Sequence, residues 1–129
     1  MASDAESFGF AARYRLKKRR EFNRLQNGSA KYYSKHFLVL VADSETQHSR
    51  LGITITTKVD KRAVVRNRLK RRIREIFRLN RYRLCKNFDM VVIARQNAAE
   101  CKFSDIRREI LGLLRYNGLV ERAGDGSTD

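Results

Sequence analysis

One segment, Arg62–Arg78, places the tightest constraint on how this chain can fold. Its apolar residues recur at intervals of three and four, the period of one face of an α-helix: Val65, Leu69, Ile73, Ile76 and Phe77. The rest of the segment carries eight cations and a single acid. We therefore predict a helix that packs one apolar stripe against a core and keeps a densely positive face outward.

The positive face is not an ordinary solvated surface, because such surfaces mix charges of both signs. Here Lys70, Arg74 and Arg78 follow one another at intervals of four, where like charges repel. The 129-residue chain has 29 Lys and Arg against 14 Asp and Glu. Residues 13–24 and 61–83 hold this excess, with seven and eleven cations against one acid each. A polyanion would relieve the repulsion, which leaves nucleic acid and an anionic membrane as candidates.

The kind of cation favours nucleic acid. Seven of the eight cations in Arg62–Arg78 are arginine, whose planar fork matches phosphate. A membrane-surface helix would need a free apolar face, but the predicted sheet needs the only apolar stripe. The sequence has no apolar run of membrane-spanning length and opens without a secretion signal. We therefore expect a cytoplasmic protein with no membrane partner.

The remaining periodicity predicts an α+β domain. A short helix is expected over "KKRREFNRLQNGS", which Asn27-Gly28 would end, and a last helix over residues 103–118. Strands are expected near residues 31–34, 36–42, 51–57 and 87–95, with helices on the oily face of one sheet. We assign residues 1–12 to a flexible N-terminal segment, 13–118 to the domain and 119–129 to a flexible tail.

Nothing in the sequence indicates a catalytic or metal site. The acids are scattered, and Cys85, Cys101, His36 and His48 have no metal-ligand spacing. From the sequence we assign neither kind of site, and the sequence does not locate protein-bound metal ions. Strands on both sides of the basic helix favour a sheet-based RNA binder over a helix-turn-helix protein. Aromatic residues near the cations would stack on bases, or would pack in the core.

At "RNRLKRRIREIF" the sequence resembles the protein subunit of bacterial ribonuclease P. The resemblance includes "LGITITTKVDKRAVVRNRLKRRIREIFR", "YRLKKRREFNRL" and "NFDMVVIAR", and covers roughly residues 13–118. It implies the order α-β-β-β-α-β-α, a four-stranded sheet and a left-handed β-α-β crossover, similar to a ribosomal-protein domain. It also implies that an RNA subunit, using Mg²⁺, removes the 5′ leader of precursor tRNA. The protein would bind that RNA and the single-stranded leader, and would assist substrate and Mg²⁺ binding.

The resemblance also implies residue roles. The residues that would face the catalytic RNA are Arg62, Arg66, Asn67, Arg68, Lys70, Arg71 and Arg74. Those that would form the leader-binding cleft are Phe22, Arg15, Lys17, Tyr33, Phe37, Thr54, Thr56 and Lys58. The chain departs from the family pattern in two places, with Thr57 where a second lysine is common and Gln26 where a second aromatic is common. No obligate protein partner is expected. The alternative is a general basic RNA-binding or ribosome-associated module on the same fold.

Overall fold

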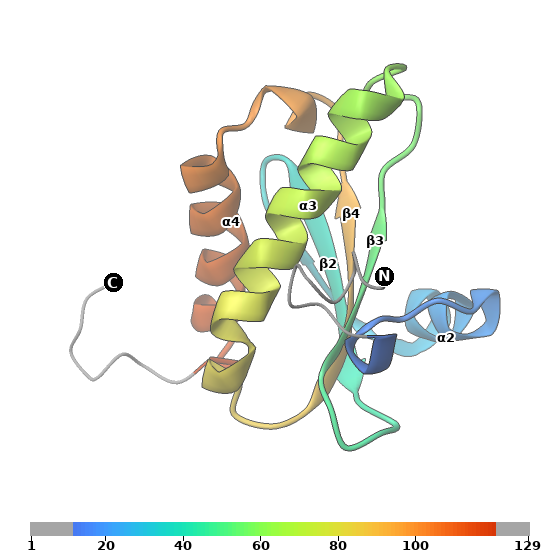
Figure 1. The fold of residues 1–129 in the computed structure, drawn as a ribbon. Helices are drawn as coiled ribbons and strands as arrows, with labels where there is room; N and C mark the ends of the chain where they lie inside the picture. The colour runs from blue at the N-terminus through green and yellow to red at the C-terminus, as the bar shows by residue number, and fades with distance from the viewer. Residues whose placement is uncertain (1–11, 121–129) are drawn as a thin grey trace.

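A computed structural model describes residues 12–120, which form a four-stranded sheet, three α-helices and three short 3-10 helices (Figure 1). The strands are β1 (Ala30–Tyr33), β2 (Phe37–Asp43), β3 (Arg50–Thr54) and β4 (Phe88–Ala94). The α-helices are α2 (Arg19–Gly28), α3 (Ala63–Asn80) and α4 (Phe103–Tyr116). The 3-10 helices are η1 (Ala12–Tyr14), η2 (Arg81–Arg83) and η3 (Ala98–Glu100). The order of α-helices and strands is the one that the resemblance implies.

The sheet has the strand order β1-β2-β4-β3. β1 pairs with β2 and β2 with β4 antiparallel, whereas β3 and β4 are parallel. Because parallel neighbours need a crossover, α3 returns the chain from the end of β3 to the start of β4. In Figure 1 this crossover is left-handed, as the resemblance implies, and it is an exception to the usual right-handed rule.

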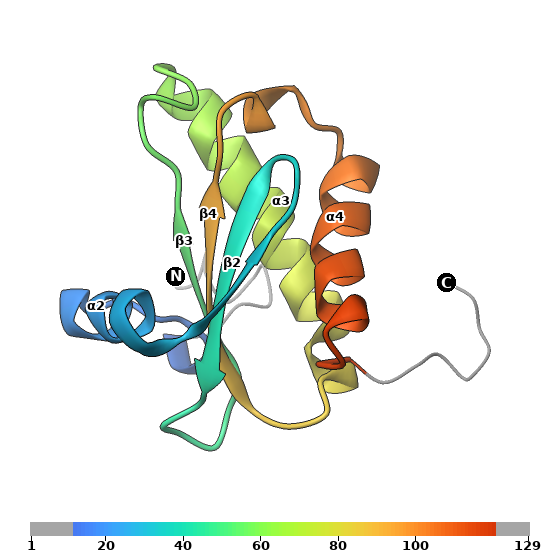
Figure 2. The same cartoon turned by 180° about the vertical axis from the view of Figure 1, so that it is seen from behind.

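The main core lies between the sheet and the pair α3 and α4, which cover the same face (Figures 1 and 2). The five stripe residues predicted in α3 are its buried residues: Val65, Leu69, Ile73, Ile76 and Phe77. From α4 the buried residues are Ile106, Ile110, Leu111 and Leu114. The periodicity therefore predicted correctly which side of α3 packs inward.

A second, smaller core lies on the opposite face of the sheet. There Leu16 and Leu25 pack on Leu40 of β2 and Val91 of β4, so α2 covers the face that α3 and α4 leave open. The prediction that the helices share one face was wrong for α2. The reason is that β2 and β4 are continuous apolar runs, and such runs supply apolar side chains to both faces of a sheet.

A buried ion-pair cluster joins α2 to the sheet. Asp89 of β4 is 0% exposed, and its carboxylate accepts hydrogen bonds from Arg24 of α2 (2.5 Å) and from Arg50 of β3 (2.7 and 2.9 Å). Arg50 also donates to Glu21 of α2 at 2.9 Å. Burial alone would raise the pKa of Glu21, but the Lys18 and Lys17 amides and the Arg50 guanidinium outweigh it and lower that pKa. The cluster fixes α2 by charge as well as by apolar contact.

Several boundaries differ from the prediction by one to three residues. β3 ends at Thr54 rather than at Thr57. Val120 is buried and bridges to Leu84, and the Leu119 amide donates to the Leu114 carbonyl, so the folded domain extends at least two residues beyond the predicted limit at 118. Residues 1–11 and 121–129, the remainder of the predicted flexible segments, lie outside the described residues.

Candidate nucleic-acid interface

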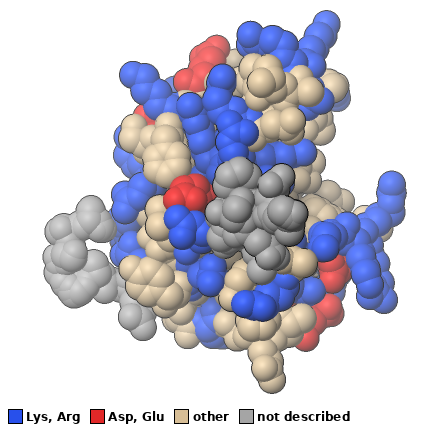
Figure 3. Space-filling view, in the orientation of Figure 1, with Lys and Arg blue, Asp and Glu red and all other residues tan. Residues whose placement is uncertain are grey.

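The outward side of α3 presents a cluster of cations, which we call the α3 face: Arg68, Lys70, Arg71 and Arg74. Within residues 12–120 none of these four forms an ion pair with an acid. In the space-filling view Lys and Arg gather over α3 (Figure 3). Asn67 is exposed beside the first of them. The α3 face is therefore a surface of like charges held close together.

The start of α3 is held by its own charged residues. The Asp60 carboxylate accepts hydrogen bonds from the Arg62 amide (2.8 Å) and guanidinium (3.0 and 2.9 Å), and these bonds lower the pKa of Asp60 to about 2. Arg66 donates to the carbonyl oxygens of Asp60 and Lys61 at 3.0 and 2.9 Å. Carbonyls orient the Arg66 guanidinium without neutralising it, so its charge stays available at the edge of the α3 face.

A pocket of about 150 Å³ lies along β3, between the N-terminal segment with α2 on one side and α3 on the other. Its cationic lining is Arg15, Lys17, Lys70 and Arg74, and Phe22 contributes an aromatic wall. Desolvation, together with repulsion from Arg15 and Arg71, lowers the pKa of Arg74. The residues predicted for catalytic RNA and those predicted for the leader therefore meet in one positive pocket.

The position of Phe22 depends on a glycine. A Cβ atom at Gly52 of β3 would lie 2.6 Å from Cζ of Phe22, closer than non-bonded carbons approach. The absence of a side chain there lets the ring lie directly on the strand. Phe22 belongs to α2, and the ion-pair cluster anchors that helix to the sheet. The cluster therefore also holds the Phe22 ring over Gly52.

Beyond the part that α2 covers, one row of side chains crosses the sheet on the same face. The strand register aligns Tyr33 of β1, Leu38 of β2, Ile93 of β4 and Thr54 of β3. Tyr33 is 61% exposed, with Arg95 5.5 Å from its ring centre, and the other three are half-buried. Since strands are spaced about 4.8 Å apart, the row spans roughly 14 Å. The predicted cleft includes Tyr33 and Thr54 but not Leu38 and Ile93, because only the strand register shows that these two lie between them.

Phe37 was predicted in the leader cleft, and the structure contradicts this. It is 0% exposed and belongs to the main core under α3 and α4, on the other face of the sheet. Side chains alternate along a strand, so when Leu38 faces the α2 side, Phe37 must face the core. The sequence of an all-apolar run does not indicate which of two neighbours points to which side.

Thr56 and Lys58 lie in the turn between β3 and α3, not on the strand. The Val59 amide donates to the Thr56 carbonyl at 3.0 Å, and the Lys58 amide donates to the Thr56 hydroxyl at 3.3 Å. Both side chains are exposed. Lys58 therefore adds a positive charge between the end of β3 and the start of α3.

These features define a class: a small, basic α+β protein with a left-handed crossover, whose crossover helix carries, beside a positive pocket, cations that have no acidic partner among residues 12–120. A family model described as Ribonuclease P matches residues 10–117. The chain belongs to the ribonuclease P family, and its curated relatives carry the name ribonuclease P protein component. Within residues 12–120, no helix is both long enough and apolar enough to cross a membrane.

The similarity covers most of the chain. The ribonuclease P protein component of Syntrophus aciditrophicus is 41% identical over 100 residues, 78% of this chain and 82% of that protein. The component of Geobacillus kaustophilus is 34% identical over 116 residues, covering 89% and 95%. The RNase P protein structure from Staphylococcus aureus superposes with a TM-score of 0.76 at 31% identity, covering 84% of this chain and 98% of that one. The Thermotoga maritima structure gives 0.71 at 37% identity, covering 79% and 96%.

Proposed function

We propose that this chain is the protein partner of a ribonuclease P RNA and that its α3 face binds the phosphates of that RNA. One observation carries this proposal: Arg68, Lys70, Arg71 and Arg74 all lie in α3 and have no acidic partner in the described part of the chain. Their repulsion is relieved when they neutralise RNA phosphates, and the cations condensed on the RNA are released. Arg62, Arg66 and Asn67 extend the contact toward the start of the helix.

The single-stranded leader of precursor tRNA is proposed to bind on the α2 side of the sheet. Phe22 offers a ring for stacking and Arg15 and Lys17 offer charge, all three within the pocket beside β3. Thr54 and Tyr33, with Leu38 and Ile93 between them, provide a row on which further bases could rest. Lys58 and Thr56 stand at the junction between this row and the α3 face.

Catalysis in this proposal belongs to the RNA subunit, and the Mg²⁺ ions belong there as well. Among the described residues, one cluster could hold a cation, formed by His36, Cys101 and Glu109. Its thiol and imidazole are poor ligands for Mg²⁺, which requires oxygen. The chain would therefore assist Mg²⁺ binding indirectly, by reducing repulsion between substrate and catalytic RNA. The cytoplasmic location expected from the sequence belongs to the same proposal.

The test is cleavage of a precursor tRNA by a bacterial ribonuclease P RNA at low Mg²⁺, with and without the full chain. Strong stimulation is expected, with no cleavage by the protein alone. Arg68→Ala with Arg71→Ala should remove most of the stimulation, whereas the matched change Arg108→Ala should not. Arg108 is an exposed arginine of α4 that pairs with Asp105 at 2.9 Å.

The alternative functions give different results in the same assay. A general RNA-binding or ribosome-associated module would bind RNA yet leave cleavage unchanged. A protein-only nuclease would cleave without the RNA subunit. Either result would overturn the proposal.

A further inference from the structure

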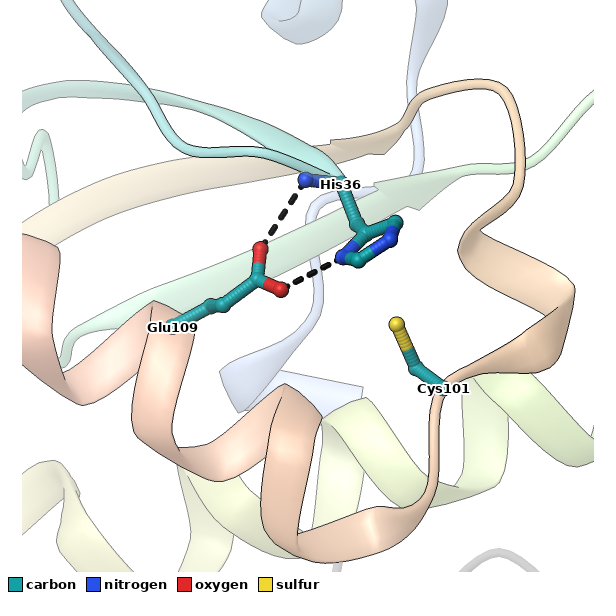
Figure 4. Close-up of side chains that lie close together, drawn as sticks. All are labelled: His36, Cys101 and Glu109. Atoms are coloured by element: carbon teal, nitrogen blue, oxygen red, sulfur yellow. Dashed lines mark hydrogen bonds and ion pairs between the residues drawn. The ribbon is translucent and has the colours of Figure 1, made fainter.

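A second site lies outside the nucleic-acid surface, where three elements meet. His36 precedes β2, Cys101 lies between η3 and α4, and Glu109 is in α4, and the three side chains converge (Figure 4). One potential ligand atom from each residue lies within 4.8 Å of the others. Within residues 12–120 these residues form the one group of three or more His, Cys, Asp or Glu side chains compact enough to hold an ion.

The donor set indicates which ion would bind. Thiolate sulfur, imidazole nitrogen and carboxylate oxygen together are typical of Zn²⁺, which takes four tetrahedral ligands. Bonds of about 2.0–2.3 Å place those ligands roughly 3–4 Å apart, close to the spacing already present. We propose that His36, Cys101 and Glu109 form a Zn²⁺-binding site, with water as the fourth ligand.

The thiol of Cys101 is the observation that points to a ligand. Cys101 is 5% exposed, and its sulfur makes no hydrogen bond to any residue from 12 to 120. It is directed toward the imidazole and the carboxylate (Figure 4). The acids Glu109, Asp105 and Glu100 lie close enough to Cys101 to act on its charge, and their negative field would attract a cation, in a chain of net charge +15.

The carboxylate is already oriented for this role. Oε1 of Glu109 accepts hydrogen bonds from the Ser34 hydroxyl at 2.7 Å and the His36 amide at 2.9 Å. Oε2 lies 2.5 Å from Nδ1 of His36, so a metal ion would replace this contact by bonds to both groups. Such outer hydrogen bonds hold ligands in metal sites. The side chains of His36 and Glu109 are 17% and 15% exposed, which leaves a route for the ion from solvent.

The site also contacts the basic helix. Arg72 of α3 donates a hydrogen bond to the Cys101 carbonyl at 3.2 Å. A bound ion would therefore fix the η3–α4 connection against α3 on the side away from α2. This inference is independent of the proposed function, because it concerns residues outside the α3 face and the pocket.

The test is titration of the reduced full chain with Zn²⁺ in competition with a chromophoric chelator, and with Co²⁺ as a spectroscopic probe. One equivalent should bind, and Co²⁺ should produce a thiolate-to-cobalt charge-transfer band. Excess Mg²⁺ should displace neither ion. Absence of the band in the native chain would overturn the proposal without any variant, so a folding defect cannot obscure the result.

Variants assign the ligands. Cys101→Ser should abolish the charge-transfer band and weaken Zn²⁺ binding at least about tenfold, since loss of outer-sphere partners alone costs 10- to 100-fold. Glu109→Gln should weaken binding but retain the band. Cys85→Ser is the matched control, because Cys85 is exposed and remote in sequence from the cluster, and it should bind as the native chain does. Loss of the band in Cys85→Ser rather than in Cys101→Ser would refute the assignment.

Discussion

Two groups of cations, one that anchors α2 and one on the α3 face, are used in opposite ways. In α2 and the strand beside it, Arg24 and Arg50 bond to the buried carboxylate of Asp89. On α3, the cations of the α3 face have no acidic partner among the described residues. In the sequence, Arg24 ends a run of Lys and Arg that looks like the run containing the α3 face. The difference shows that charge density alone does not indicate which cations are available to a polyanion.

The division has a structural consequence. A buried cation that loses its carboxylate partner destabilises the fold. Here the ion pairs of Arg24 and Arg50 with Asp89 hold α2, the helix that carries Phe22. Unpaired cations contribute little to folding but release counterions when they meet phosphate. Substitutions in the two regions should therefore have different effects. Changes to the ion pairs that anchor α2 should lower the free energy of unfolding, and changes on the α3 face should lower the affinity for RNA.

The largest effect is expected from Asp89→Ala. It leaves the guanidinium groups of Arg24 and Arg50 in a largely buried site without their carboxylate, which should lower the free energy of unfolding by roughly 3–5 kcal/mol. Urea denaturation would measure it. The matched control is Asp43→Ala, whose carboxylate pairs with Lys86 at the surface and should change little. Equal losses in both variants would mean that the buried cluster does not anchor α2.

Gly52→Ala should act on the position of Phe22. The new methyl group would meet the ring at 2.6 Å, and overpacking of this kind costs roughly 1–3 kcal/mol. Affinity for leader-bearing precursor tRNA should fall, while affinity for the ribozyme RNA should remain. Gly112→Ala in α4 is the matched control, because no atom lies within 4 Å of its new Cβ. An unchanged leader affinity in Gly52→Ala would remove Phe22 from the proposed leader surface.

Arg68→Ala combined with Arg71→Ala should act on RNA affinity and leave stability nearly unchanged. If about six phosphates are neutralised, the native slope of log K against log salt is about −4 to −5. The double variant should make it less steep by about 2 and weaken binding roughly 10- to 30-fold at physiological salt. Filter binding across a salt series measures both. A native slope in the double variant would show that these arginines do not meet phosphate.

The smallest effect concerns the start of α3. Hydrogen bonds from Arg62 lower the pKa of Asp60 to about 2, below the value of about 3.9 expected in an unfolded chain. The charged carboxylate therefore stabilises the fold above about pH 4, and this contribution is lost as the pH falls toward 2. Asp60→Asn should lower the melting temperature slightly at neutral pH, and the difference from the native chain should disappear as the pH falls through about 2. A difference that persists unchanged at low pH would contradict this role for Asp60.

Much of the fold was predictable from local patterns. The prediction of the buried stripe in α3 was correct at all five positions. α2 ends at Asn27-Gly28, as predicted. Local patterns did not assign Phe37 to the main core or α2 to the opposite face, because an apolar strand run is compatible with either orientation. The resemblance supplied the left-handed crossover, which periodicity does not encode.

The sequence by itself determined the basic helix and its division into an apolar and a charged side, because a helical period relates residues that are near one another in the chain. Only the tertiary structure decided which charges are paired and which donors converge. Asp89 meets Arg24 across 65 residues, and Glu109 meets His36 across 73. Such contacts depend on strand register and helix packing, which place distant segments side by side in space.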